Sequence, residues 1–162
     1  MTSTPHYGAE TTGTEVAQRF TEEMRGKTVL ITGISPNSLG ETLALTIAAH
    51  APAHLILASR TPSKLQAVKQ KLPSSSVTRI TLLPLNLASQ TSIREAAKKI
   101  KPLASHIDVL INNAGVVSSK KQETSEGIEL TFGTNHIGHF LLTSLLPNIT
   151  RIVNVSSLGY KL

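Results

Sequence analysis

A glycine-containing turn after an aliphatic run is the first place in this sequence that could support chemistry. The run is Lys27–Ile31, and the turn is TGISPNSLG at residues 32–40. Gly33 would let the chain turn tightly, and Gly40 would let a following helix pack closely on the run. The N–H groups in the first turn of that helix would bind an anion such as a pyrophosphate. A glycine pair alone is weak evidence, so its meaning depends on the surrounding elements.

The next aliphatic run ends in cations rather than acids. His54–Ala58 is followed by Ser59, Arg60 and Thr61, and Lys64 comes one helical turn later. A carboxylate at this place would accept a hydrogen bond from the ribose 2′-hydroxyl of NAD, whereas a cation suits the 2′-phosphate of NADP. The pattern favours NADP. The alternative is that Arg60 is an ordinary surface residue.

Strands and helices alternate along the chain, and they must bring these two places together. Aliphatic, β-branched runs predict buried strands at Lys27–Ile31, His54–Ala58, Arg79–Leu83, Ile107–Ile111 and Arg151–Val155. Helices are predicted at Gly40–His50, from Pro62 to Leu72 after a Thr61 cap, from a Ser92–Glu95 capping box through Lys99, and at Leu130–Leu146 before Pro147. This alternation implies right-handed crossovers and a parallel sheet that is covered on both faces. The predicted fold class is therefore α/β: a doubly wound, Rossmann-like parallel sheet with strand order 3-2-1-4-5 and a ligand crevice between strands one and four.

Two regions are expected along the chain. Residues 1–26 form an N-terminal arm, loose over residues 1–14, with a short helix at Glu15–Met24 that Gly26 ends. Residues 27–162 form the NADP-binding domain.

Composition narrows the class of protein. The chain has 162 residues, 40% of them hydrophobic and 3% aromatic, which suits one soluble domain with an aliphatic core. It has no cysteine, so disulfides and thiolate chemistry are excluded. The formal net charge is +6, and the lysines are spread along the chain, which indicates solvated faces and attraction to an anionic small molecule rather than to nucleic acid. No apolar stretch is long enough to cross a bilayer, so no membrane association and a cytoplasmic location are expected.

Four motifs in order resemble the short-chain dehydrogenase/reductase family: the turn at residues 32–40, Asn112-Asn113-Ala114-Gly115 after the fourth strand, Asn135 in the long helix, and Ser156-Ser157 after the fifth strand. The stretches TNHIGHFLLT (residues 134–143) and RIVNVSSL (residues 151–158) resemble the retinol-dehydrogenase-like branch. The glycine turn and ASRT at residues 58–61 resemble fungal members linked to secondary metabolism. The resemblance covers the chain from about Lys27 to its end.

The resemblance implies a role for each matching residue. The cofactor-binding residues would be Thr32, Gly33, Ile34, Leu39 and Gly40 in the turn, Arg60 and Lys64 at the 2′-phosphate, Asn86 and Leu87 beside the adenine, and Asn113, Ala114 and Gly115 after the fourth strand. Asn135 would be catalytic and would hold a water in the proton relay. Ser157, rather than Ser156, would hydrogen-bond the oxygen of a small-molecule substrate.

The sequence also departs from the family pattern. The turn is one residue longer than usual, Ser38 stands where a middle glycine is common, and Asn86 replaces the usual aspartate. The family's Tyr-x-x-x-Lys acid/base motif is not present before the end at Leu162, and the adjacent Tyr160-Lys161 receive no catalytic role. The chain is therefore expected to lack the family's last strands and to be impaired as an enzyme.

Two functions stay open from these residues. The first is an NADP-dependent oxidoreductase that acts on a carbonyl or alcohol, with a place in secondary-metabolite biosynthesis. The second is a non-catalytic NADP-binding or interaction protein. His136 and His139 are three residues apart, but no third ligand accompanies them, so no metal site is predicted. The apolar stripe of Leu130–Leu146 is expected in the core or in a homodimer interface, which the family commonly builds from this helix.

Overall fold

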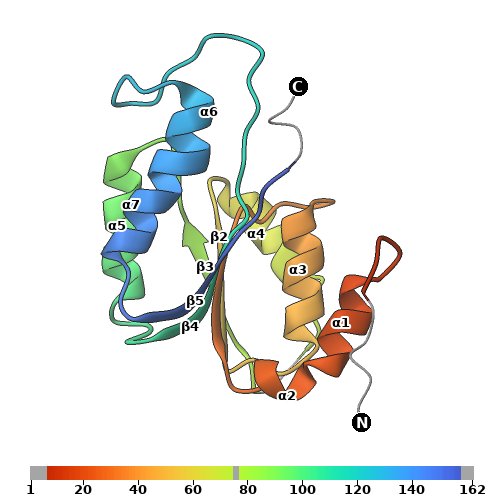
Figure 1. The fold of residues 1–162 in the computed structure, drawn as a ribbon. Coiled ribbons are helices and arrows are strands. Elements are labelled where there is room, and N and C mark those ends of the chain that lie inside the picture. The colour runs from red at the N-terminus through yellow and green to blue at the C-terminus, as the bar shows by residue number, and fades with distance from the viewer. Residues whose placement is uncertain (1–6, 75–76, 158–162) are drawn as a thin grey trace.

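The computed structural model describes residues 7–74 and 77–157 and contains one five-stranded parallel sheet (Figure 1). The strands are β1 (Thr28–Thr32), β2 (His54–Ser59), β3 (Arg79–Pro84), β4 (Ile107–Asn112) and β5 (Ile149–Asn154). Their order is β3-β2-β1-β4-β5, so the predicted doubly wound topology is confirmed. In β1, Ile31 pairs with Leu57 on one side and with Ile111 on the other. The central strand therefore has a neighbour from each half of the chain.

Helices cover both faces of the sheet (Figure 1). They are α1 (Gly13–Arg19), α2 (Thr21–Met24), α3 (Leu39–Ala48), α4 (Pro62–Lys69), α5 (Gln90–Ile100), α6 (Leu130–Phe132), the π-helical segment η1 (Gly133–Gly138) and α7 (His139–Leu145). Helices α3 and α4 lie on one face, whereas α5 and α7 lie on the other. No helix in the described part of the chain is long and apolar enough to cross a bilayer.

The sheet separates two hydrophobic cores, one under each layer of helices. In β1, Leu30 packs with Ile93 of α5 and Leu142 of α7, whereas Ile31 packs with Ala44 of α3 in the opposite core. Successive strand residues point to opposite faces, and the side chains on both faces of β1 and β2 are buried. This burial explains why these strands are aliphatic throughout rather than alternating with polar residues.

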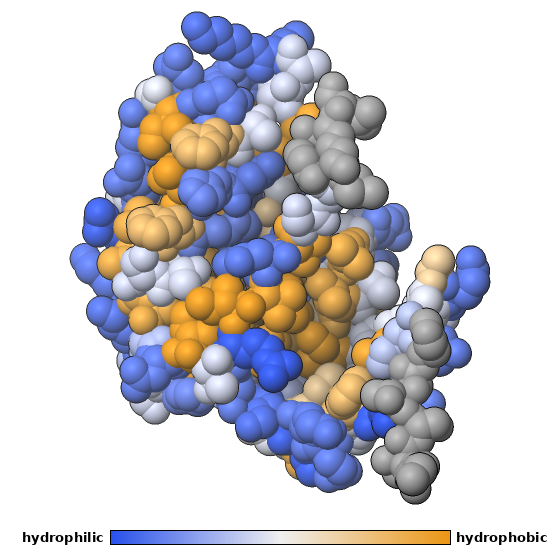
Figure 2. Space-filling view, in the orientation of Figure 1, coloured by the Kyte–Doolittle hydropathy of each residue, from blue (hydrophilic) through white to orange (hydrophobic). Residues whose placement is uncertain are grey.

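Strand β5 is the exception, because its side chains are mostly exposed. It lies at the edge of the sheet, and Ile152, Val153 and Val155 are between 39% and 46% exposed. Figure 2 shows apolar side chains gathered over this part of the surface.

The predicted helix at Glu15–Met24 is wrong in detail, because the structure has two short helices there. Thr12 caps α1 in a reciprocal capping box with Glu15, which starts the first helix at Gly13. Phe20 leaves helical geometry at φ −102° and ψ 29°, and α2 begins after it. Gly26 follows with φ +72°, so this glycine does take a conformation that ends a helix.

The start of α5 is also corrected. The expected capping box at Ser92 and Glu95 does not form, because the helix begins two residues earlier, at Gln90. The Ser89 hydroxyl accepts a hydrogen bond from the Ser92 N–H at 3.3 Å. The Ser92 hydroxyl instead accepts one from the Asn86 N–H at 3.0 Å. At α4, Thr61 is the N-cap residue as predicted, but its side chain makes no capping hydrogen bond.

The helix predicted at Leu130–Leu146 exists, but its middle is wider than an α-helix. Segment η1 carries Asn135 and is bounded by Gly133 and Gly138. A side chain at Gly138 would collide with the backbone carbonyl oxygen of Leu87. The glycine therefore lets this helix approach the loop after β3, and that approach brings Asn135 close to the carboxyl ends of the strands.

Two buried histidines make stability depend on pH. Burial lowers the pKa of His54, with a further contribution from the Arg79 charge, and burial lowers the pKa of His139. Each histidine takes up a proton more readily in the unfolded chain, whose pKa is near 6.5, so stability falls as the pH drops through about 6.5.

We therefore expect the urea unfolding midpoint to be lower at pH 5.5 than at pH 7.5. Each histidine contributes at most about 1.4 kcal/mol per pH unit in this window. His54→Gln should reduce the dependence of this midpoint on pH. A midpoint that rises on acidification would contradict this expectation.

Candidate cofactor site

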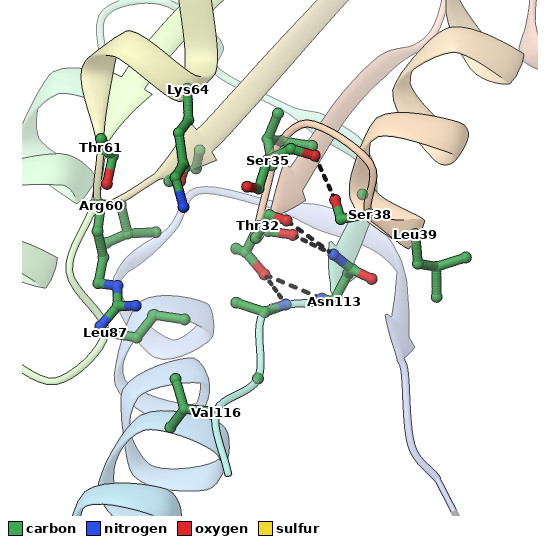
Figure 3. Close-up of a pocket in the computed structure, with 18 of the residues that line it drawn as sticks. Thr32, Ser35, Ser38, Leu39, Arg60, Thr61, Lys64, Leu87, Asn113 and Val116 are labelled. Carbon is green, nitrogen blue, oxygen red and sulfur yellow. Dashed lines mark hydrogen bonds between the residues drawn. The ribbon is translucent and has the colours of Figure 1, made fainter. Parts of the chain in front are cut away.

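A cavity of about 430 Å³ opens at the carboxyl ends of β1, β2 and β4, where the fold predicts a ligand (Figure 3). Every cofactor residue predicted from the sequence lines it except Asn86: Thr32, Gly33, Ile34, Leu39, Gly40, Arg60, Lys64, Leu87, Asn113, Ala114 and Gly115. The sequence reasoning missed other lining residues: Ser35, Ala58, Ser59, Thr61, Leu85, Val116, Thr134 and Val155. Ser59 and Thr61 flank Arg60 and could have been inferred from it, whereas Leu85 and Val116 carry no local signal.

The turn after β1 approaches the loop after β4 so closely that glycine is required. Gly33 has φ +79°, and a Cβ there would lie 2.6 Å from the Cα of Ala114. A Cβ at Gly40 would lie 2.5 Å from the carbonyl oxygen of Gly33. Real Cβ atoms do not come this close to backbone, so both positions exclude a side chain. These glycines give the cavity a floor made of backbone.

Hydrogen bonds join the same two loops, as Figure 3 shows. The Asn113 side chain donates from Nδ2 to the carbonyl oxygen of Thr32 at 2.8 Å. The Thr32 hydroxyl accepts hydrogen bonds from the backbone N–H groups of Asn113 and Ala114, both at 3.0 Å. Thr32 is fully buried. The Thr32 hydroxyl and the Asn113 side-chain nitrogen therefore fix the cavity walls relative to each other.

The extra residue in the turn is accommodated by Asn37, which takes a left-handed conformation at φ +57°. Its N–H donates to the Glu41 carboxylate at 2.8 Å, and Lys71 pairs with that carboxylate at 2.7 Å. Lys71 and the Asn37 N–H lower the pKa of Glu41. Lys71 thereby balances the negative charge at the start of α3, and the Asn37 N–H is occupied by this carboxylate.

Ser38, which replaces a glycine in the expected pattern, caps α3. Its hydroxyl accepts from the Glu41 N–H at 3.3 Å and donates to the carbonyl oxygen of Ser35 at 2.6 Å. Capping removes one of the free N–H groups at the helix start. An anion in the cavity would therefore meet the remaining N–H groups of this turn.

Two cations reach over the cavity, Arg60 from the β2–α4 connection and Lys64 from the first turn of α4 (Figure 3). Arg60 and Lys64 are both exposed, and neither forms an ion pair with a described residue. Among the described lining residues there is no Asp or Glu. The electrostatics of this end of the cavity therefore favour an anionic ligand.

Thr134 supplies an unsatisfied polar group in the wall. Its side chain is only 4% exposed, and its hydroxyl has no hydrogen-bond partner in residues 7–74 and 77–157. Buried polar groups are nearly always paired, and an unpaired one carries a desolvation cost. The hydroxyl itself is not exposed to the cavity. The backbone floor and the free cations fit a phosphorylated dinucleotide.

Comparison with known proteins decides the family. The family model described as short chain dehydrogenase matches residues 27–161. The chain belongs to the short-chain dehydrogenase family. The resemblance inferred from the motifs is thus confirmed.

Several short-chain dehydrogenase relatives are similar over most of this chain. Oxidoreductase fscI from Fusarium equiseti is 36% identical over 163 residues, which cover 93% of this chain and 63% of the relative. Retinol dehydrogenase 13 from Homo sapiens is 39% identical over 142 residues, covering 83% of this chain and 42% of the relative. The chain spans about half the length of the curated relatives it matches.

Solved structures share the fold of this chain. A protein of undescribed activity from Mycobacterium paratuberculosis superposes with a TM-score of 0.71 at 36% identity, covering 85% of this chain and 48% of that one. A metagenomic short-chain oxidoreductase, solved in complex with NADP, superposes with a TM-score of 0.69 at 21% identity, covering 84% of this chain and 63% of that one. The second similarity supports the fold alone.

The two catalytic residues predicted from the sequence, Asn135 and Ser157, are not among the lining residues. Asn135 accepts from the Val116 N–H at 2.8 Å and donates to the Val116 carbonyl oxygen at 2.9 Å. Its side chain therefore holds the loop that lines the cavity. Ser157 is exposed and is the last described residue after β5. Tyr160-Lys161 lie outside the described residues.

Asn86 does not line the cavity, so the structure gives no support to its predicted contact with adenine. Its side-chain oxygen accepts a hydrogen bond from the Ala88 N–H at 3.1 Å. This short-range bond shapes the loop after β3 and leaves Leu87 on the cavity wall.

The two helix histidines face different surroundings. His136 is exposed and stacks on Phe132 with ring centroids 5.2 Å apart. His139 is buried and contacts Thr32. Among the described residues no three His, Cys, Asp or Glu side chains gather as a metal site would require.

Proposed function

We propose that this chain binds NADP(H) and forms the cofactor-binding part of an oxidoreductase acting on a carbonyl or alcohol. One observation carries the proposal: Arg60 and Lys64 reach over the cavity whose floor is the glycine turn, and no described carboxylate lines it. A 2′-phosphate suits two unpaired cations, whereas NAD would leave them without a partner. A role in secondary-metabolite biosynthesis is part of this proposal, supported by the resemblance of the turn and of residues 58–61 to fungal members.

Each group of residues would have one task toward the cofactor. Backbone N–H groups of the turn at residues 33–40 would bind the pyrophosphate, and Arg60 and Lys64 would bind the 2′-phosphate. Leu85 and Leu87 would pack against a face of the adenine ring. The bound cofactor would supply the hydride chemistry. Ser157 would hydrogen-bond the substrate oxygen, and Asn135 would hold the loop at Val116 in place.

Isothermal titration of the purified chain with NADPH and NADH tests the proposal. We expect NADPH to bind at least about tenfold more tightly, because a charge-assisted contact contributes about 1.5–3 kcal/mol. Equal affinities would disprove the preference for NADP. A folded chain that binds neither nucleotide would disprove the function itself.

A second function, NADP(H) binding without catalysis, is favoured by the cavity lining. The described lining residues include no Tyr, His, Asp or Glu that could transfer a proton near neutral pH. NADPH consumption with a panel of small aldehydes and ketones separates the two functions. Turnover above the background of heat-denatured protein would exclude the non-catalytic alternative.

A homodimer through Leu130–Leu146 is also part of the proposal. Phe132 and Phe140 on this helix are 54% and 65% exposed, which is a large apolar area for an unpartnered surface. Sedimentation should show a dimer that Phe140→Ser weakens. A cytoplasmic location stays a prediction.

The unpaired Thr134 hydroxyl leads to a further expected result. Thr134→Val should raise the free energy of unfolding slightly and leave NADPH affinity unchanged, because the hydroxyl is buried without a partner among the described residues and is not exposed to the cavity. Thr131→Val, on the same helix but away from the cavity lining, is the matched control. Titration and urea denaturation of both variants provide the measurements. A lower free energy of unfolding in Thr134→Val than in Thr131→Val would contradict this expectation.

A further inference from the structure

His139 connects the two segments that hold the cavity wall. It is 6% exposed and begins α7. Its Nε2 lies 2.9 Å from the Thr32 hydroxyl oxygen, and its Nδ1 lies 3.0 Å from the backbone carbonyl oxygen of Asn135. One imidazole therefore contacts both the end of β1 and the π-helical segment.

The hydrogen-bond partners determine where the imidazole proton lies. A carbonyl oxygen can only accept, so Nδ1 must carry a proton. Burial lowers the pKa of His139, which keeps the ring neutral, and Nε2 is then an acceptor. The Thr32 hydroxyl must donate to it. This direction is consistent with the rest of the network, because the same oxygen accepts from the N–H groups of Asn113 and Ala114.

These hydrogen bonds form a closed ring. The Thr32 hydroxyl accepts from the N–H groups of Asn113 and Ala114, and the backbone continues from there to Val116. Both backbone groups of Val116 bind the Asn135 side chain, and the Asn135 carbonyl returns to His139. Segment 113–116 lines the cavity along its whole length, and it is therefore held at both ends by residues that His139 joins.

We propose that His139 is a positioning residue that sets the place of segment 113–116 and of Asn135 relative to the β1 turn. The proposal rests on the proposed function only in naming NADP(H) as the ligand of that wall. An apolar residue at this position would leave the Asn135 carbonyl oxygen without this donor. The Thr32 hydroxyl would then have the carbonyl oxygen of Ile111 at 3.4 Å, a longer and weaker contact.

The first test needs no cofactor. Long-range proton–nitrogen NMR on the unaltered chain should show His139 as the neutral tautomer with a proton on Nδ1 and none on Nε2. Free histidine prefers the opposite tautomer, so this signature would not arise from burial alone. A proton on Nε2 would overturn the proposal.

The second test compares His139→Phe and His139→Gln with His136→Phe. Loss of the hydrogen bonds should speed amide exchange at Ala114 and Val116 in His139→Phe. It should also weaken NADPH binding about tenfold, the effect of losing about one buried hydrogen bond. Glutamine offers one donor and one acceptor, as neutral imidazole does, so His139→Gln should recover part of both losses. His136→Phe, at an exposed position on the same helix, should match the unaltered chain.

The outcomes separate this proposal from the proposed function. A lower free energy of unfolding with unchanged amide exchange and unchanged NADPH affinity would show a merely structural role and would overturn the proposal. If His139→Phe does not fold, the same decision follows from His139→Gln and from the tautomer. If the unaltered chain binds no NADPH but shows the tautomer and the exchange effect, the proposed function fails while the positioning role stands.

Discussion

Gly33→Ala is expected to abolish NADPH binding within the range of a titration, a loss of at least about 100-fold, and to destabilise the chain by about 2–4 kcal/mol. Two costs combine at this position. The backbone has φ +79°, which disfavours any L side chain, and the new Cβ would meet the Cα of Ala114 at 2.6 Å. The floor of the cavity would have to separate before the methyl group could fit.

Gly127→Ala separates these two costs. Gly127 has φ +76°, but a Cβ added there would have no neighbouring atom within 4 Å among the described residues, so only the backbone strain applies. We expect about 1–2 kcal/mol of destabilisation and unchanged NADPH affinity. Urea denaturation and calorimetry of both variants test this difference. If Gly33→Ala bound NADPH as the unaltered chain does, the close approach of the two loops would not define the site.

Removing the cations should change the choice between the two nucleotides. Arg60→Ala should weaken NADPH binding about tenfold or more and leave NADH binding nearly unchanged, because only NADPH carries the 2′-phosphate. Lys64→Ala should have the same sign and a smaller effect, since an ammonium lacks the bidentate geometry of guanidinium. The NADPH affinity of the unaltered chain should fall with added salt more steeply than that of Arg60→Ala.

Lys69→Ala is the matched control for these variants. Lys69 lies on α4 with Lys64 but is not among the lining residues, so its removal tests net charge alone. An equal loss of NADPH affinity in Lys69→Ala would indicate a diffuse charge effect. A parallel loss of NADH affinity in Arg60→Ala would indicate that Arg60 does not contact the 2′-phosphate.

The sheet could be predicted because several independent features of the sequence indicate the same strands. Strands buried on both faces are aliphatic throughout, as β1 and β2 are. All five aliphatic runs of the sequence are strands in the structure, although β5 is mostly exposed. Short crossovers then leave few topologies, and the order 3-2-1-4-5 follows. The lining residues Gly33, Gly40, Arg60 and Lys64 followed from the same reasoning, because a phosphate site in this fold lies where β1 and β2 end.

What sequence reasoning missed depends on contacts between distant segments. The π-helical segment that carries Asn135 packs closely against the loop after β3, and no local sequence pattern predicts this. The unpaired hydroxyl of Thr134 is visible only once its neighbours are placed. The start of α5 failed for a local reason: several serines can cap a helix, and Ser92 is already bonded to Asn86. The sequence spacing of His139 suggests half of a metal pair, whereas its partners are a hydroxyl and a carbonyl.

The central place of β1 has a consequence for how the chain reaches its native state. Its contacts with β2 join neighbouring parts of the chain, but its contacts with β4 join segments about eighty residues apart, such as Thr28 and Asp108. Closing such a long loop is entropically costly, so we expect the β1–β4 seam to form late. The cavity lies across the junction of β1 and β4. A partly folded chain in which this junction has not formed therefore lacks the cofactor site. Added NADPH should therefore slow unfolding more than it speeds folding, because the nucleotide binds only after the sheet is assembled.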